Sequence, residues 1–191
     1  MKSLTNYINE KLIVNKNYNP YTYAPKSFDE LRNIVIDRYN KLGAGTKQNP
    51  IDFNDIDVSN LDSFYNNNDM GLFEGTKFKH IDISGWDVSN VTDMSCMFLY
   101  CKALKTVGDL SKWDVSKVTN MGSMFFKCEK LESVGDISKW DVSKVTNMEF
   151  MFCNCESFNQ DIYNWNVSSV ISMDYIFWGC PLKNEYKPKF K

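Results

Sequence analysis

One phrase occurs four times in the second half of this chain, and it restricts the fold more than any other feature. The copies are WDVSNVTDMSCMF (86–98), WDVSKVTNMGSMF (113–125), WDVSKVTNMEFMF (140–152) and WNVSSVISMDYIF (165–177), so their tryptophans are 27, 27 and 25 residues apart. A fixed period of about 20–50 residues is typical of solenoids, in which each unit buries its apolar face only against its neighbours. Such stacked repeats usually act as binding surfaces.

Composition supports a folded domain and excludes an electrostatic track for nucleic acid. Of the 191 residues, 43% are hydrophobic and 15% aromatic, which is enough for a sizeable core. The 22 basic and 24 acidic residues are spread along the chain and give a formal net charge of −2. We therefore expect no nucleic acid partner. Because the sequence lacks a long apolar run, we also expect no membrane span.

Each repeat contains two candidate elements. In the first full copy, Val91, Met94, Met97 and Phe98 have the spacing of the buried stripe of a short helix. Ser89 is positioned as its N-cap, as are its equivalents Ser116, Ser143 and Ser168. An Asp-Ile-Ser or Asp-Leu-Ser segment before the tryptophan indicates a short strand. The sequence therefore predicts an α/β solenoid of leucine-rich-repeat-like coils, with one short strand and one short helix in each.

Residues 1–50 lie outside the repeats and are expected to form a helical N-terminal cap segment. Ser3 could begin a short helix that carries apolar residues through Leu12. Ser27 and Glu30 form a capping box for a second, apolar-faced helix, which Gly43 would end. We expect this second helix to cover the open end of the first coil.

A degenerate copy precedes the four clear ones. IDVSNLDSF (56–64) matches the opening of the phrase with isoleucine in place of tryptophan, and after an inserted YNNND segment Leu72 and Phe73 recover the Met-Phe position. This gives about five coils over residues 51–180. Pro181 then stops the stack, and residues 181–191 form a C-terminal tail.

The pattern DISxWDVSxVTxMxxMF resembles the repeat of BspA-like leucine-rich-repeat surface proteins. These are repeats of unknown function, of about 25 residues, of the mycoplasma-lipoprotein type. The resemblance covers about residues 51–180 and implies a curved solenoid that binds proteins, with no catalytic residues. The opening SLTNYINEKL and the segment NDIDVSN also resemble small repeat proteins of Bacteroidales and their phages.

The first residues show neither a signal peptide nor a lipoprotein leader. We therefore expect a cytoplasmic protein, located in the host-cell cytoplasm or the virion if a phage encodes it. In a reducing compartment the six cysteines would be thiols. Four of them follow the repeat period, which favours buried packing over a disulfide or a soft-metal site. These four are Cys101, Cys128, Cys155 and Cys180.

Two columns of aspartates also follow the period. Asp82, Asp109, Asp136 and Asp161 form the first, and Asp87, Asp114 and Asp141, continued by Asn166, form the second. Side chains accepting backbone N–H bonds in turns would explain both columns, and calcium bridging between coils is the alternative. The single histidine, His80, is expected to be an incidental surface residue. Phosphate-loop, GxSxG and HExxH motifs are absent, so we expect no enzyme activity, cofactor or metal.

The tryptophan column has two interpretations. The indoles could pack between coils as core, or they could form an exposed aromatic stripe that anchors a partner. The function that we expect is non-catalytic binding of an unidentified protein, and the alternative is a structural or particle-decorating protein that self-associates through its C-terminal coil at Tyr175, Phe177 and Trp178. The candidate partner-binding residues are Trp86, Lys112, Trp113, Lys139, Trp140, Tyr163 and Trp165.

Overall fold

The computed structural model describes residues 21–66 and 70–190, which begin with a connector to one α-helix, α2 (Phe28–Leu42). The Ser27 side chain accepts a hydrogen bond from the Glu30 N–H, as a helix N-cap does. Gly43, at a φ of 74°, ends the helix, and its N–H donates to the Tyr39 carbonyl. The second helix expected from the sequence is thus confirmed. The shorter helix expected to begin at Ser3 lies outside the described residues.

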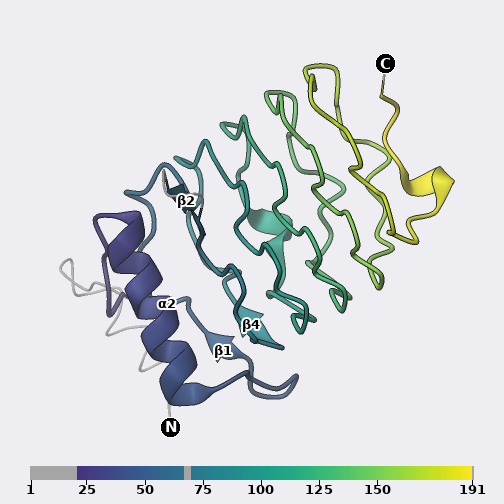
Figure 1. Cartoon of the computed structure of the whole chain (residues 1–191). Coiled ribbons are helices and arrows are strands. Elements are labelled where there is room, and N and C mark those ends of the chain that lie inside the picture. The colour runs from purple at the N-terminus through teal and green to yellow at the C-terminus, as the bar shows by residue number, and fades with distance from the viewer. Residues whose placement is uncertain (1–20, 67–69, 191) are drawn as a thin grey trace, which may run out of the picture.

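The strands are short and form two sheets. β1 (Ile51–Asp52) pairs in parallel with β4 (Ile81–Asp82), and β2 (Tyr65–Asn66) pairs antiparallel with β3 (Met70–Gly71). Two 3₁₀ turns follow, η1 (Leu110–Lys112) and η2 (Asn184–Tyr186). Most of the remaining described chain consists of turns and extended segments, joined by isolated parallel bridges. Figure 1 shows these segments side by side, from α2 to the C-terminus.

The prediction of an α/β solenoid of leucine-rich-repeat-like coils is wrong. The protein is a small mixed α/β domain: across residues 21–66 and 70–190 there are only one α-helix and two sheets of two strands each. The strands expected at the Asp-Ile-Ser segments are mostly absent: β4 includes only Asp82 of the first, and residues 136–138 form no strand. The corresponding Asp-Leu-Ser segment forms η1 with Asp109 as its N-cap. Ser89 caps no helix, and its N–H donates to the Asp87 side chain.

Left-handed backbone residues explain why the repeat segments are not helical. Cys96 and Tyr100 have φ values of 56° and 60°, which a right-handed helix cannot contain. The chain instead forms turns with these residues third, in which the Met97 N–H donates to the Met94 carbonyl and the Cys101 N–H to the Phe98 carbonyl. A positive φ at the third residue is typical of a type II turn. The same conformation recurs at Ser123, Lys127, Phe150, Asn154 and Tyr175.

Alternate amides in these turns bond to the next repeat. The N–H groups of Met94, Cys96, Phe98 and Tyr100 donate to the carbonyls of Asn120, Gly122, Met124 and Phe126, at 2.9–3.0 Å. We call four such amides a donor row. The following rows are Met121, Ser123, Phe125 and Lys127, then Met148, Phe150, Phe152 and Asn154. The backbone bonds that a helix would make within itself here join one repeat to its neighbour in parallel register.

The inward side chains make a continuous core. Val91, Met94, Met97 and Phe98 are all fully buried, so the sequence correctly indicated which residues lie inside. The Phe98 and Phe125 rings are stacked with centroids 5.2 Å apart and an interplanar angle of 3°. Phe152 continues the stack on one side and Phe73 on the other. Phe73 therefore takes the Met-Phe position expected for the degenerate copy, and the hairpin of β2 and β3 accommodates the inserted residues.

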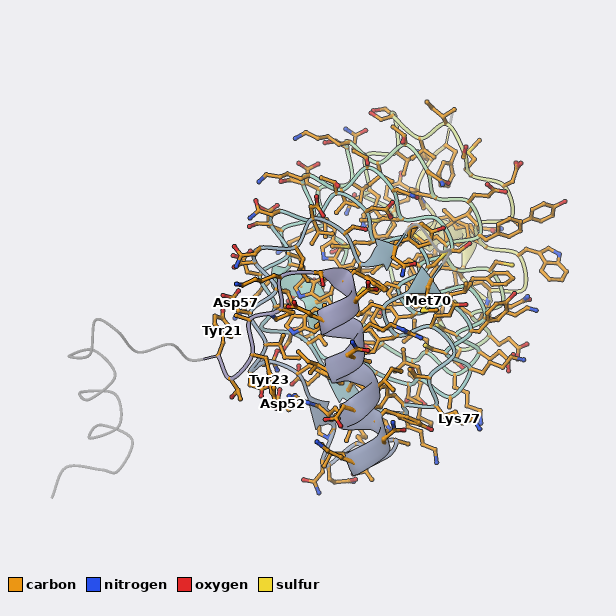
Figure 2. The ribbon with its side chains drawn as sticks, turned by 60° about the vertical axis from the view of Figure 1, so that its left-hand side comes forward. Tyr21, Tyr23, Asp52, Asp57, Met70 and Lys77 are labelled. Atoms are coloured by element: carbon orange, nitrogen blue, oxygen red, sulfur yellow. The ribbon has the colours of Figure 1, made fainter. Side chains whose placement is uncertain are left out.

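Helix α2 lies against the first repeat, and Figure 2 views the molecule from that side. Its side chains Leu31 and Val35 are fully buried. Arg32 projects from the same helix and donates from Nη1 to the carbonyls of Gly71 (2.8 Å) and Leu72, and from Nη2 to that of Glu74 (3.4 Å). Burial lowers the pKa of this guanidinium below its ordinary value. Arg32 thus supplies donors to backbone carbonyls that face away from the second repeat.

None of the helices in the described ranges has the length and apolar character needed to cross a bilayer.

Removing one ring from the phenylalanine stack should destabilise the whole domain. Phe125→Ala deletes a fully buried ring between Phe98 and Phe152, and we expect it to lower the free energy of unfolding by roughly 3–5 kcal/mol. Urea denaturation followed by tryptophan fluorescence measures this change. Lys130→Ala, at an exposed position of the same repeat, is the control and should leave the midpoint almost unchanged. Equal midpoints for the two variants would show that the stack is not the core.

Arg32→Met tests the closure of the first repeat. Methionine keeps an apolar stem of similar length, but it leaves the carbonyls of Leu72 and Glu74 without their donor and removes one of two donors from that of Gly71. Stability should therefore fall by about 1–3 kcal/mol. The matched control is Lys41→Met on the same helix, because Lys41 is exposed and pairs with exposed Asp37, and it should cost less than about 0.5 kcal/mol. If both variants unfold at the same urea concentration, Arg32 has no special role at this end.

Candidate functional site

The four repeat tryptophans are core residues. Trp86, Trp113, Trp140 and Trp165 are 4–5% exposed, and the last three are stacked in sequence with centroids 6.1–6.4 Å apart. Each indole N–H donates to a carbonyl of the preceding repeat at 2.8–3.3 Å, as from Trp140 Nε1 to the Leu110 carbonyl. Of the two interpretations of this column, packing between repeats is therefore confirmed. Their rings do not form the exposed stripe that would anchor a partner.

The other three residues predicted to bind a partner lie on the surface. Lys112 and Lys139 are exposed at equivalent positions of neighbouring repeats, and Tyr163 is 41% exposed. The Lys189 ammonium lies 5.3 Å from the centre of the Tyr163 ring. Because the tryptophans point inward, the structure does not bring the seven predicted residues together into one site.

The aspartate columns hold turns. In the first column, Asp82 accepts from the Ser84 N–H at 2.9 Å, and in the second, Asp114 accepts from the Ser116 N–H at 3.1 Å. Hydrogen bonds from Ser116 and Ser143 lower the pKa of the Asp114 and Asp141 carboxyls. Asn166 accepts the same bond from the Ser168 N–H, which a turn role explains. The part of the chain that the structure describes contains no cluster of His, Cys, Asp and Glu suited to a metal.

The periodic cysteines are packed thiols. Cys101, Cys128 and Cys155 are buried, and each Sγ donates to a phenylalanine carbonyl of the preceding repeat at 2.9–3.1 Å. All six cysteines are thiols, so buried packing is confirmed over a disulfide for these three, whereas Cys180, the fourth of the column, is half-buried. The expectation of a surface histidine is wrong: His80 is only 8% exposed, its Nδ1 lies 3.0 Å from Thr106 Oγ1, and burial lowers its pKa.

A second set of aromatic rings lies on the outside of the repeats. Tyr100 contacts Phe126 edge-on at 5.5 Å, Phe126 contacts Phe150 in the same way at 5.7 Å, and Phe150 stacks on Tyr175 at 5.3 Å. Tyr175 and Trp178 are 62% and 61% exposed. We call these five residues the aromatic face.

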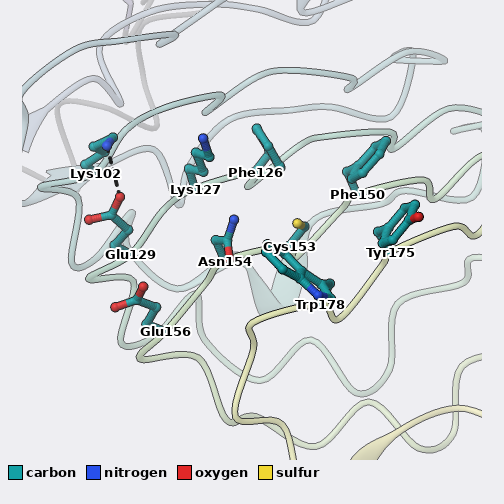
Figure 3. A pocket seen from close by; sticks show the side chains of 10 residues that line it. All are labelled: Lys102, Phe126, Lys127, Glu129, Phe150, Cys153, Asn154, Glu156, Tyr175 and Trp178. Atoms are coloured by element: carbon teal, nitrogen blue, oxygen red, sulfur yellow. Dashed lines mark ion pairs between the residues drawn. The ribbon is translucent and has the colours of Figure 1, made fainter.

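A hollow of about 530 Å³ lies on the aromatic face, as Figure 3 shows from close by. Phe126, Phe150, Tyr175 and Trp178 form its apolar wall, and charged side chains border it. Among these, Lys102 pairs with Glu129 at 3.1 Å. The Lys127 ammonium lies 5.3–5.4 Å from the rings of Phe126 and Tyr100. Cys153, Asn154 and Glu156 complete the lining. An apolar wall with a few charges at its edge is typical of a surface that binds the side chains of another protein.

Sequence reasoning missed most of this face because its residues do not repeat. Phe150 and Tyr175 occupy the position of Cys96 and Ser123, where the left-handed backbone recurs. Trp178 occupies the position of Phe126. The signal that could have found the face is the presence of large apolar residues at the variable positions beside the fixed Met and Phe. Tyr175 and Trp178 were expected to be exposed, although only as a self-association surface.

Comparison with known proteins places the chain among repeat proteins without an assigned activity. Residues 59–189 match the model of the family described as "Mycoplasma protein of unknown function, DUF285". No curated protein and no solved structure gives a match.

The buried thiols should make stability sensitive to alkali. Burial raises the pKa of Cys101 to about 12, and it raises those of Cys128 and Cys155 well above the ordinary value of 9.0. Their contribution is complete below the unfolded-state pKa and is lost as the pH rises from there through the folded-state pKa. We therefore expect the urea midpoint to fall between pH 8 and about pH 10.5, and to fall less in Cys128→Ala.

Val118→Ala is the control for this pH experiment. It removes buried apolar volume from the same repeat without removing a titratable group, so it should lower the midpoint at both pH values and keep the full alkaline decrease. An identical pH dependence in Cys128→Ala would show that the thiol does not cause the decrease.

Proposed function

This chain belongs to the family described as Mycoplasma protein of unknown function, DUF285, and we propose that it is a non-catalytic protein-binding module that holds a partner protein on its aromatic face. The observation that carries the proposal is the exposure of Tyr175 and Trp178, 62% and 61%, beside an apolar hollow. Tyrosine and tryptophan bury much apolar area for little lost rotamer entropy, and they dominate the energetics of protein interfaces.

The scaffold under the face favours binding without rearrangement. Phe150 lies within a donor row whose amides bond to the next repeat at 2.7–3.0 Å. The core below the face is also ordered, because the Phe125 and Phe152 rings of these two neighbouring repeats are stacked. Ordered backbone on both sides of the hollow reduces the entropy that a bound partner must overcome. This rigidity suits a surface that recognises a fixed shape.

The charged border would add selectivity. Lys102 and Glu129 already pair across neighbouring repeats, whereas Glu156, in the next repeat along, is exposed. Lys127 lies beside two rings of the face. Charges at the edge of an apolar interface affect which partner associates and how fast, more than they affect the final affinity.

The repeat motif adds support of a different kind. It resembles the repeat of BspA-like surface proteins, for which protein binding is the expected role. The weaker resemblance to repeat proteins of Bacteroidales and their phages adds a host-cell or virion setting to this proposal. Both resemblances concern sequence motifs and do not depend on leucine-rich-repeat geometry.

Self-association is the second candidate function. Ile171 is 82% exposed in the same terminal repeat as Tyr175 and Trp178, so the last repeat presents apolar surface to a second copy. Light scattering or sedimentation over a hundredfold range of concentration separates this idea from the first. A mass that stays monomeric would leave the aromatic face for a different protein.

Peptide selection tests the proposed function directly. A random twelve-residue peptide library displayed on phage is selected against the immobilised chain, and the best peptides are synthesised for affinity measurement. Binding should weaken roughly tenfold or more in Trp178→Ser and Tyr175→Ser, because each change removes an exposed aromatic anchor.

The control is the Lys112→Ala, Lys139→Ala double variant, which alters exposed residues away from the hollow and should bind normally. All variants should keep the urea midpoint of the parent. A selection without binders, or binders that ignore both aromatic substitutions, would contradict the proposal. Binders lost only in the double lysine variant would move the site to that surface.

A further inference from the structure

The last donor row differs from every row before it. Met173, Tyr175, Phe177 and Gly179 occupy the positions of Met148, Phe150, Phe152 and Asn154, whose amides all donate to the next repeat. Within residues 21–66 and 70–190, the amides of the last row have no hydrogen-bond acceptor. Backbone N–H groups that lack a partner in the fold must be satisfied by water or by another molecule.

The tail covers only part of this edge. The Ile162 N–H donates to the Tyr186 carbonyl, and the Phe177 ring lies 6.5 Å from that of Phe190. Met173 and Tyr175 nevertheless remain 37% and 62% exposed. The row is therefore open to solvent at Met173 and Tyr175, next to the apolar hollow of the aromatic face.

The opposite end of the repeats is closed by chemistry of the complementary kind. In the first repeat, the amides of Phe73 and Gly75 donate to the carbonyls of the second. In later repeats, the carbonyl just before each such amide accepts from the preceding repeat. The carbonyls of Leu72 and Glu74 occupy these acceptor positions in the first repeat. Arg32 donates to both of these carbonyls. A side chain of α2 thus already satisfies these acceptors at the first end, whereas the last donor row lacks the acceptors that every row before it has.

This difference argues against a second copy as the occupant. If two copies met through their last repeats, donor rows would face donor rows. If one copy followed another head to tail, the incoming first repeat would bring carbonyls that Arg32 already occupies beneath α2. A protein partner satisfies the last row when it brings free backbone carbonyls of its own.

We propose that the last donor row binds an extended, apolar segment of the partner protein through that segment's backbone carbonyls. Alternate carbonyls of the segment accept from Met173, Tyr175, Phe177 and Gly179, as those of Ser172, Asp174, Ile176 and Trp178 do for the preceding row. Its side chains pack on the exposed rings of Tyr175 and Trp178. Addition of a segment to an open backbone edge is a general mode of peptide recognition.

An apolar segment fits better than an acidic one. Exposed Asp174 lies in the last repeat, and Glu129 and Glu156 line the hollow beside it. These carboxylates repel acidic side chains of a bound segment, whereas an apolar segment brings its neutral carbonyls to the amide row without such repulsion. This inference rests on the proposed function and adds to it the backbone chemistry and the segment type of the partner.

Amide hydrogen exchange followed by NMR tests the proposal on the full chain, with a selected twelve-residue peptide as the probe. In the free protein the amides of Met173, Tyr175 and Gly179 should exchange fast, and those of Met148, Phe150 and Asn154 slowly. Saturation with peptide should slow the last row by about tenfold or more and leave the interior row unchanged.

Ester scanning of the same peptide provides a second, independent measurement. Replacing an amide by an ester weakens the adjoining carbonyl as an acceptor, so esters that weaken alternate carbonyls should reduce affinity by about 3- to 10-fold each. Esters at the intervening positions serve as the matched control and should have little effect. This dependence on odd or even position is specific to a segment bound through one backbone edge.

The outcomes separate the two proposals. A peptide that needs Trp178 but neither slows exchange in the last row nor shows the alternating ester effect overturns this inference and leaves the proposed function standing. Peptides that bind independently of both Tyr175 and Trp178 overturn the proposed function and, with it, the proposed binding of an extended segment. Concentration-dependent dimerisation that slows exchange in the last row without peptide would also overturn the inference, because a second copy would then be the occupant.

Discussion

The structure depends on one backbone interaction, the hydrogen bond from each amide of a donor row to a carbonyl of the next repeat. Because buried N–H groups need acceptors, this bond fixes the register of neighbouring repeats at 26 residues from Met94 to Asn120 and from Phe98 to Met124. The register in turn places ring on ring in the core and holds each indole N–H against a carbonyl of the preceding repeat. The outer columns of side chains, including the aromatic face, follow from the same alignment.

The sequence predicted the burial pattern better than the backbone path. Spacing at i, i+3, i+6 and i+7 correctly placed Met94, Met97 and Phe98 inside, but a series of turns satisfies that spacing as well as a helix does. What decides between them is the left-handed conformation of Cys96 and Tyr100, and neither residue is a glycine that would have signalled it. By contrast, α2 was predictable because Ser27, Glu30 and Gly43 are local signals that need no neighbour.

The candidate site was only partly predictable for a related reason. Repetition identified the tryptophans as candidate binding residues. The residues that recur in every copy are, however, those that neighbouring repeats need for packing, and the indoles therefore point inward. The residues that we propose for recognition, Phe150, Tyr175 and Trp178, lie where the copies differ. The role of Arg32 was equally invisible, because its acceptors lie 39–42 positions further along the chain. Contacts of that range follow from the fold and not from a local pattern.

The hairpin of β2 and β3 shows how the molecule tolerates changes in length. It interrupts the first repeat between Phe64, whose amide donates to the Asp93 carbonyl, and Phe73, whose amide donates to the Met97 carbonyl. The extra residues leave both bonds in place. Register is therefore kept by a few backbone contacts, while chain length is free to vary between them. A lineage could acquire new loops at this point without refolding its core, and a designer could graft a loop there for the same reason.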